Sequence, residues 1–172
     1  MPTRSFRDQM PGVSLALAML LAALPWGLPA DARFLLPLLP YIVIHFWVVR
    51  RPALMPEWLI FLAGLGTDVM THGPLGYWSL IYLLGFALCT GSRGLTRWGA
   101  LGRWLQFCVT IVGLAFVQWL VASLYVLSVA DWKPLVRSAT GLCLLYPLVG
   151  MMFRPVLRLW RPAANPSLQR GG

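Results

Sequence analysis

The sequence predicts an all-α fold, a polytopic helical bundle embedded in a membrane, with residues 1–172 forming a single transmembrane domain. Hydrophobic residues make up 59% of the chain and charged residues 11%, less than half of the roughly 25% charged residues in soluble domains. Basic residues stand in short clusters between long uncharged runs, as in proteins that cross the bilayer several times. Since a helical span needs about 20 residues, the chain has room for about six spans and no sizeable extramembrane domain.

Composition also excludes two other classes of protein. The net charge of +9 is typical of a nucleic-acid-binding protein, but the basic residues do not line up as one stripe. We therefore expect no nucleic-acid partner. A secreted disulfide scaffold is excluded as well, because the chain has only 3 cysteines and none are spaced as a pair.

The first predicted span covers residues 11–28, with Pro11 near its first turn, where a missing N–H costs nothing. A cleaved signal peptide is the alternative, since Arg4 and Arg7 form a basic leading region. We favour a span, because no small-x-small cleavage site follows and hydrophobic spans continue at once.

The second span covers residues 35–49, and Pro37 and Pro40 lie near its start, where they remove little of the hydrogen-bond ladder. The third span, residues 56–70, is the shortest. It reaches only about 22 Å against a hydrocarbon core of about 30 Å. It is either a short, locally thinned span or one arm of a re-entrant hairpin.

The last three spans cover residues 75–90, 104–127 and 135–153, and residues 154–172 form a basic cytoplasmic tail. Tryptophan rings prefer the headgroup layer of a membrane. Most of the tryptophans fall near predicted span ends, as this preference requires: Trp26, Trp47, Trp58, Trp78, Trp98, Trp104, Trp132 and Trp160.

The basic residues predict the orientation, because Lys and Arg collect on the cytoplasmic side. With six spans, only Arg33, Lys133 and Arg137 lie on one side. The other side then holds eleven arginines, so we expect both termini in the cytoplasm: Arg4, Arg7, Arg50, Arg51, Arg93, Arg97, Arg103, Arg154, Arg158, Arg161 and Arg170.

Asp68 is the most informative ionisable residue, since burying such a group in a bilayer is costly. It follows Gly64 and Gly66 near the end of the third span and precedes a turn rich in Gly and Pro. Two interpretations stay open: a structural or partner-binding carboxylate at the outer surface, or a cap of the tight turn. A metal pair with His72, four residues on, is a weak third possibility because two ligands alone specify little.

The remaining polar residues do not form a pattern that is typical of an enzyme active site. His45, inside the second span, is either a proton relay or a hydrogen-bond partner of another helix, and we favour the second. Gln118 and Ser123 of the fifth span are interpreted in the same way. We find no nucleophile with a His partner, no carboxylate pair and no phosphate loop, so we expect no catalytic residues, no cofactor and no metal. The cysteines are interpreted as small apolar packing residues: Cys89, Cys108 and Cys143.

The segment from Pro40 to Pro52, an aromatic-rich apolar span that ends in a short polar stretch, resembles the opening of the core of the MreD family. A glycine-containing third span, Gly66-Thr67-Asp68 and then Gly73-Pro74-Leu75-Gly76 follow, which is similar to that family's most recognisable feature. MreD is a rod shape-determining membrane protein. The distinctive part covers roughly residues 36–84, and the rest agrees in hydropathy.

The resemblance implies a role in bacterial cell elongation at the inner membrane, without a reaction of its own. MreD-like proteins belong to the Rod complex, or elongasome, where they associate with the single-span protein MreC and with the actin-like MreB. The transglycosylase RodA and a class B penicillin-binding protein act in the same complex, which synthesises peptidoglycan. The residues that the resemblance marks as a partner-contact or structural motif are Pro52, Gly64, Gly66, Asp68, Gly73, Pro74, Leu75 and Gly76.

The small residues Gly64 and Gly66 predict where the transmembrane helix of MreC lies, since small residues let backbones approach closely. The family is also similar in fold to the S components of energy-coupling-factor vitamin transporters. There, a pair like Ala18 and Ala22 docks onto a coupling subunit. A small-molecule carrier is therefore the alternative function, with a pocket near the outer face formed by Asp68, His72, Tyr77 and Trp78. An integral membrane enzyme is the remaining alternative.

Overall fold

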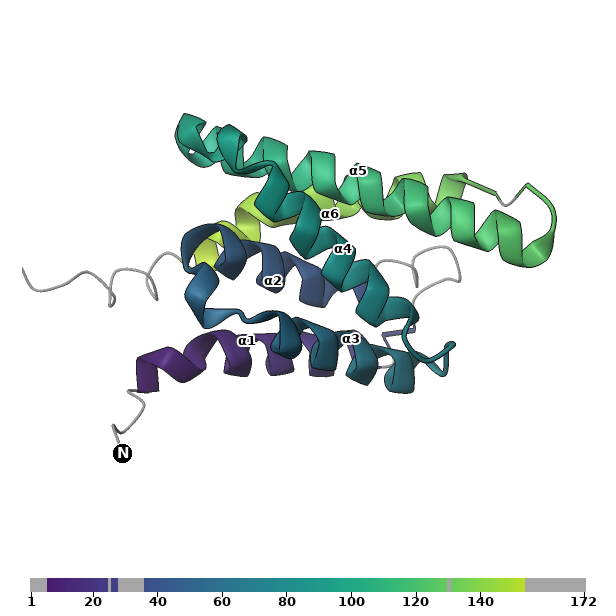
Figure 1. Ribbon diagram of the computed structural model, residues 1–172, viewed down its shortest axis with the longest axis horizontal. Coiled ribbons are helices and arrows are strands. Elements are labelled where there is room, and N and C mark those ends of the chain that lie inside the picture. The colour runs from purple at the N-terminus through teal and green to yellow at the C-terminus, as the bar shows by residue number, and fades with distance from the viewer. Residues whose placement is uncertain (1–5, 25, 28–35, 130, 154–172) are drawn as a thin grey trace, which may run out of the picture.

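The computed structural model describes residues 6–24, 26–27, 36–129 and 131–153 (Figure 1). Within these ranges the protein is all-helical and has no strand. Short 3-10 helices follow α2 (η2, Pro52–Leu54) and α4 (η3, Arg93–Trp98). The six α-helices, in chain order, are α1 (Phe6–Ala23), α2 (Leu39–Arg50), α3 (Glu57–Thr71), α4 (Tyr77–Gly91), α5 (Gly99–Val126) and α6 (Lys133–Met152).

The helices alternate in direction along the chain. In Figure 1, α1, α3 and α5 begin at one end of the bundle, and α2, α4 and α6 begin at the other. Helix α2 lies at the centre and contacts α1, α4 and α6, while α3 packs on α1 and α4, and α5 packs on α4 and α6. The predicted number and order of helices are confirmed.

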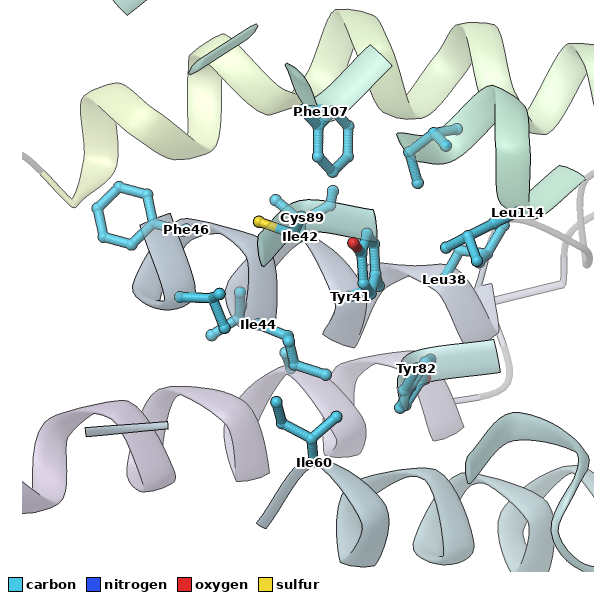
Figure 2. Close-up of a cluster of buried hydrophobic side chains, with 14 of the residues drawn as sticks. Leu38, Tyr41, Ile42, Ile44, Phe46, Ile60, Tyr82, Cys89, Phe107 and Leu114 are labelled. Carbon is cyan, nitrogen blue, oxygen red and sulfur yellow. The ribbon is translucent and has the colours of Figure 1, made fainter. Parts of the chain in front are cut away.

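The core is built around α2, whose residues 41–48 are all buried. A helix that is buried on every side belongs at the centre of a bundle, which is why this segment shows no amphipathic pattern. Figure 2 shows part of the core, in which the side chains of α2 lie among residues of the neighbouring helices. The largest fully buried side chains of α2 are Tyr41, Phe46 and Trp47.

The outer surface of the bundle carries many apolar side chains. Two helical stretches of the described chain are long and apolar enough to cross a membrane, Arg93–Leu124 and Lys133–Met152. Large hydrophobic side chains stand exposed on each of the five helices that surround α2, including Val13, Leu17, Phe61, Leu62, Leu80, Val109, Val112, Phe116, Leu120, Leu144 and Leu148. Exposed apolar surface of this extent is typical of a face that meets a membrane or another protein.

Helix α1 differs from the predicted first span of residues 11–28. It begins earlier, at Phe6, so Pro11 lies inside the helix and not near its first turn. It also ends earlier, at Ala23, because Pro25 follows and the residue before a proline disfavours the α conformation.

Two other boundaries also move. Helix α2 begins at Leu39 and not at residue 35, with Pro40 in its first turn, where a proline fits. Helix α5 begins at Gly99, five residues before the predicted span, and is 28 residues long. The helices α3, α4 and α6 match the predicted ranges within two residues at each end. The predicted basic tail, residues 154–172, lies outside the described residues.

Two of the tryptophans lie near helix ends, as predicted, but their rings are not exposed as the preference for a headgroup layer would require. Trp47 is fully buried, and its Nε1 donates a hydrogen bond to Ser14 Oγ of α1 at 2.9 Å. Trp78 is also buried, and its ring packs near that of Tyr82 on the same helix. Neither of these two rings therefore faces the surface of the bundle. Trp58, by contrast, stands exposed on α3.

Candidate functional site

The centre of the candidate site is Asp68, which is fully buried near the end of α3. Its two carboxyl oxygens accept hydrogen bonds from the backbone N–H groups of Gly76 and Trp78, each at 2.8 Å. These donors belong to the N-cap and first turn of α4, whose N–H groups have no partner within their own helix. Asp68 therefore caps α4 across the turn, and its side chain offers no exposed surface to a partner.

The turn between α3 and α4 is closed by the backbone as well. His72 caps α3 in the left-handed conformation, with φ of 54°, and the N–H of Gly73 donates to the Asp68 carbonyl oxygen at 3.2 Å. Gly76 has φ of 94°, a conformation that favours glycine. Leu75, in contrast, is 74% exposed, so it is the motif residue that projects most clearly from the bundle.

Asp68 and His72 do not share a face, because Asp68 is buried and His72 is exposed beyond the end of α3. They are therefore not arranged as a metal pair. In the described part of the chain no group of three His, Cys, Asp or Glu side chains is placed to hold a metal ion.

Gly64 and Gly66 do not form the expected surface for a partner helix. An added Cβ at Gly64 would lie 2.3 Å from Ser79 Cα, so α3 and α4 are in backbone contact there. An added Cβ at Gly66 would lie 2.6 Å from Met19 Cε of α1. Residues of the same chain occupy the space beside both glycines. The prediction that the MreC helix packs against them is corrected accordingly.

His45 links two helices, as the favoured interpretation predicted. Its Nδ1 lies 3.1 Å from the Tyr146 hydroxyl oxygen of α6, and both residues are buried. The Phe107 ring of α5 packs edge-on against the imidazole. His45 thus joins α2 to α5 and α6 at the centre of the bundle.

A polar contact between α4 and α5 that was not predicted from the sequence is made by Gln106. Gln106 is fully buried, and its Nε2 donates to the Cys89 carbonyl oxygen at 2.7 Å and to Ser92 Oγ at 3.1 Å. A glutamine inside an apolar run is the signal that would have found it. For Gln118, to which this role was assigned, the buried Nε2 has no hydrogen-bond partner among the described residues.

A hydrogen bond from Trp104 satisfies a carbonyl that Pro147 leaves free. Pro147 lies inside α6 and has no N–H, so the carbonyl oxygen of Cys143, four residues earlier, has no donor in its own helix. Trp104 Nε1 of α5 donates to that oxygen at 2.9 Å. The ring expected at a membrane interface therefore compensates the proline of a neighbouring helix.

The four residues expected to form a carrier pocket do not line one together. Asp68 and Trp78 are buried against each other, and His72 is exposed. A cavity of about 550 Å³ does lie at the same end of α3, where it is lined by residues of α1, α3 and the chain after α1, among them Met19, Trp26, Thr67 and Thr71.

A second cavity of about 560 Å³ forms an apolar groove between α5 and α6. On α5 it runs from Trp104 to Trp119, which at 1.5 Å per residue is about 22 Å of helix. Ala115 and Ala139 keep it open, since their side chains are small. We call this the α5–α6 groove.

Of the other residues singled out, Ala18 is buried in the core and Ala22 lines the cavity beside α1, so the two do not form an outward docking pair. Pro52 begins η2 and is exposed. Cys89 packs in the core, as predicted for a small apolar residue.

Comparison with profiles of protein families, with curated proteins and with solved structures finds no match to this chain.

Proposed function

We propose that this protein is an MreD-like membrane component of the bacterial cell-elongation complex, which binds MreC and helps to maintain rod shape and peptidoglycan synthesis without catalysing a reaction. The observation that carries the proposal is that several of the motif residues together fix the contact between α3 and α4. Asp68 caps α4 through Gly76 and Trp78, and Gly64 seats α4 on α3. The motif residues of α3 and of the turn that follows it, which carry part of the resemblance, thus belong to one structural unit.

We place the chain across the inner membrane several times, with both termini in the cytoplasm. Support comes from the exposed apolar side chains of the outer helices and from the alternating helix directions. The ends of α2 and α4 and the start of α5 lie at one end of the bundle, which collects Arg50, Arg51, Arg93, Arg97 and Arg103. Such a basic end favours the cytoplasmic side.

The use of the interior polar groups supports a protein that acts by binding. His45 bonds to Tyr146, Gln106 bonds to α4, and Asp68 caps a helix. Each of these groups holds helices together, and no pair of them faces a common space where a substrate would react.

We assign the α5–α6 groove as the binding site of the transmembrane helix of MreC. A single apolar helix needs a concave, lipid-facing surface with small residues, because association within lipid depends on close packing. The groove has this form over about 22 Å of α5, most of a hydrocarbon core of about 30 Å. The exposed Leu75 turn lies elsewhere, on the α3–α4 pair.

The test is copurification of MreC with the tagged protein from membranes solubilised in mild detergent. Val112 lines the groove and is 61% exposed, whereas Val109, on the same helix and 59% exposed, does not line it. We expect Val112→Trp to reduce recovery of MreC at least about fivefold through steric exclusion, and Val109→Trp to leave it unchanged. Recovery of MreC with neither the wild type nor the control contradicts the function. Equal recovery with both variants contradicts the groove.

The second candidate function is a small-molecule carrier, which the cavity of about 550 Å³ beside α1 and α3 favours. Such a volume suits a small ligand held mainly by apolar contacts. Mass spectrometry of the purified protein distinguishes the two functions. A bound vitamin-like molecule and copurifying ATPase subunits, without MreC, support the carrier.

A further inference from the structure

One cavity combines cationic side chains with an open volume. It lies at the end of the bundle where α2 ends and α5 begins, and Figure 1 shows these two helix ends near each other. It measures about 270 Å³ and is bordered by α2, α5 and α6. Two arginines line it, Arg50 from α2 and Arg103 from α5, together with Tyr146 and Gly150 of α6. Segments far apart in the sequence thus bring two positive charges to one cavity.

Arg50 is held in place on the wall of this cavity. Its Nη1 donates to the Phe46 carbonyl oxygen at 3.2 Å, and its guanidinium carbon lies 3.8 Å from the centre of the Phe46 ring. A guanidinium group has five N–H donors, so this arrangement orients Arg50 and leaves donors for a further acceptor.

The guanidinium group of Arg103 contains a buried N–H donor, Nε, that lacks an acceptor among the described residues. A buried donor without an acceptor is unfavourable, and so is the approach of two like charges. No Asp or Glu is among the described residues that line the cavity, so none of them offsets either cation.

We propose that this cavity binds a phosphate-bearing anion between Arg50 and Arg103. Arginine matches the oxygens of a phosphate with two parallel N–H donors, and a phosphate carries enough charge to offset both cations. Tyr146 also lines the wall, but its hydroxyl is already within hydrogen-bond distance of His45, so the two arginines supply the donors. Two sources share this chemistry: the headgroup of an anionic phospholipid, since basic pockets between helices at the cytoplasmic face bind such headgroups, and free inorganic phosphate.

The variants are chosen so that loss of binding is separable from loss of the fold. Arg103→Gln removes one cation. Gly150→Leu keeps both arginines and fills the cavity, because an added Cβ at Gly150 meets no atom within 4 Å. The controls are Arg97→Gln, the same charge change on an exposed residue of η3, and Gly91→Leu, whose added Cβ also meets no atom within 4 Å.

Phosphatidylglycerol is titrated into each purified protein in a neutral detergent, and bound lipid is counted by native mass spectrometry. The melting temperature is measured with and without inorganic phosphate. We expect saturable binding to the wild type, weakened about tenfold or more by Arg103→Gln and by Gly150→Leu, and changed less than about twofold by the controls.

Binding of phosphatidylglycerol that inorganic phosphate does not displace identifies the lipid headgroup as the source. Displacement by inorganic phosphate, with a rise in melting temperature that both cavity variants abolish, identifies the soluble anion. Equal binding by all five proteins, or equal loss in Arg97→Gln and Arg103→Gln, overturns the proposal. These binding measurements do not depend on the binding of MreC, because Arg103 and Gly150 do not line the α5–α6 groove.

Discussion

At the scale of single residues, the contact between α3 and α4 depends on two positions, Gly64 and Asp68. Gly64 lets the backbones meet at Ser79, and Asp68 satisfies two N–H groups at the start of α4. Both act by geometry that no other side chain reproduces, because one needs the absence of a Cβ and the other needs two acceptor oxygens on a short stem.

The two glycines of α3 are expected to respond in opposite ways to alanine. Gly64→Ala should lower the free energy of unfolding by about 2 kcal/mol, since its Cβ meets backbone atoms that cannot move aside. Gly66→Ala should be neutral or stabilising by up to about 1 kcal/mol, because its Cβ meets only the flexible end of Met19 and alanine favours helix. Unfolding in detergent measures both, and equal effects would contradict the backbone contact.

Asp68→Asn should lower the free energy of unfolding by about 2 kcal/mol. The amide can accept only one of the two N–H groups with its oxygen, so a buried donor loses its partner. Asp131→Asn is the control, because exposed Asp131 accepts one N–H, from Lys133, and Asn caps helices as well as Asp. A shift in melting temperature of the same size in both variants would argue against a double acceptor.

At the scale of helices, proline is tolerated in α6 because another helix supplies the missing donor. Trp104 Nε1 bonds to the Cys143 carbonyl oxygen that Pro147 leaves free. Removal of the donor should therefore matter only while the proline is present.

A double-mutant cycle tests this dependence. Trp104→Phe should cost about 1–2 kcal/mol of stability beyond the loss of packing, since it leaves a polar group without a partner. In the background of Pro147→Ala, the N–H of residue 147 again reaches the Cys143 carbonyl oxygen, and the cost of Trp104→Phe should shrink by that amount. Additive effects in the double variant would contradict the compensation.

At the scale of the whole molecule, the proposed membrane placement and the alternating helices together predict which turns lie on which side of the membrane. Alkaline phosphatase is active only outside the cytoplasm, because its disulfides form there. Fusions after Gly73 or Trp132 should be active, and fusions after Ala53 or Arg97 inactive. An active fusion after Arg97 would exclude the proposed orientation.

The positions of the six helices could be predicted from the sequence to within about five residues at each end. Hydrophobic runs mark the helices, and prolines and glycines mark the breaks. The boundaries that moved are those of α1, α2 and α5, where prolines or a preceding 3-10 helix decide the end of the ladder. Of the site, the importance of Asp68 was visible in the sequence, because an ionisable residue in an apolar run is costly.

The sequence by itself determined the helical class, the apolar surface and the approximate helix boundaries, because these depend on composition and on local pattern. Only the tertiary structure decided that Gly64 faces α4, that Gln106 joins α4 to α5, and that Trp47 lies in the core. Likewise it alone brought Arg50 and Arg103 to one cavity. The physical reason is that the outward-facing and core-facing sides of these helices are both apolar, so no pattern in the chain distinguishes them.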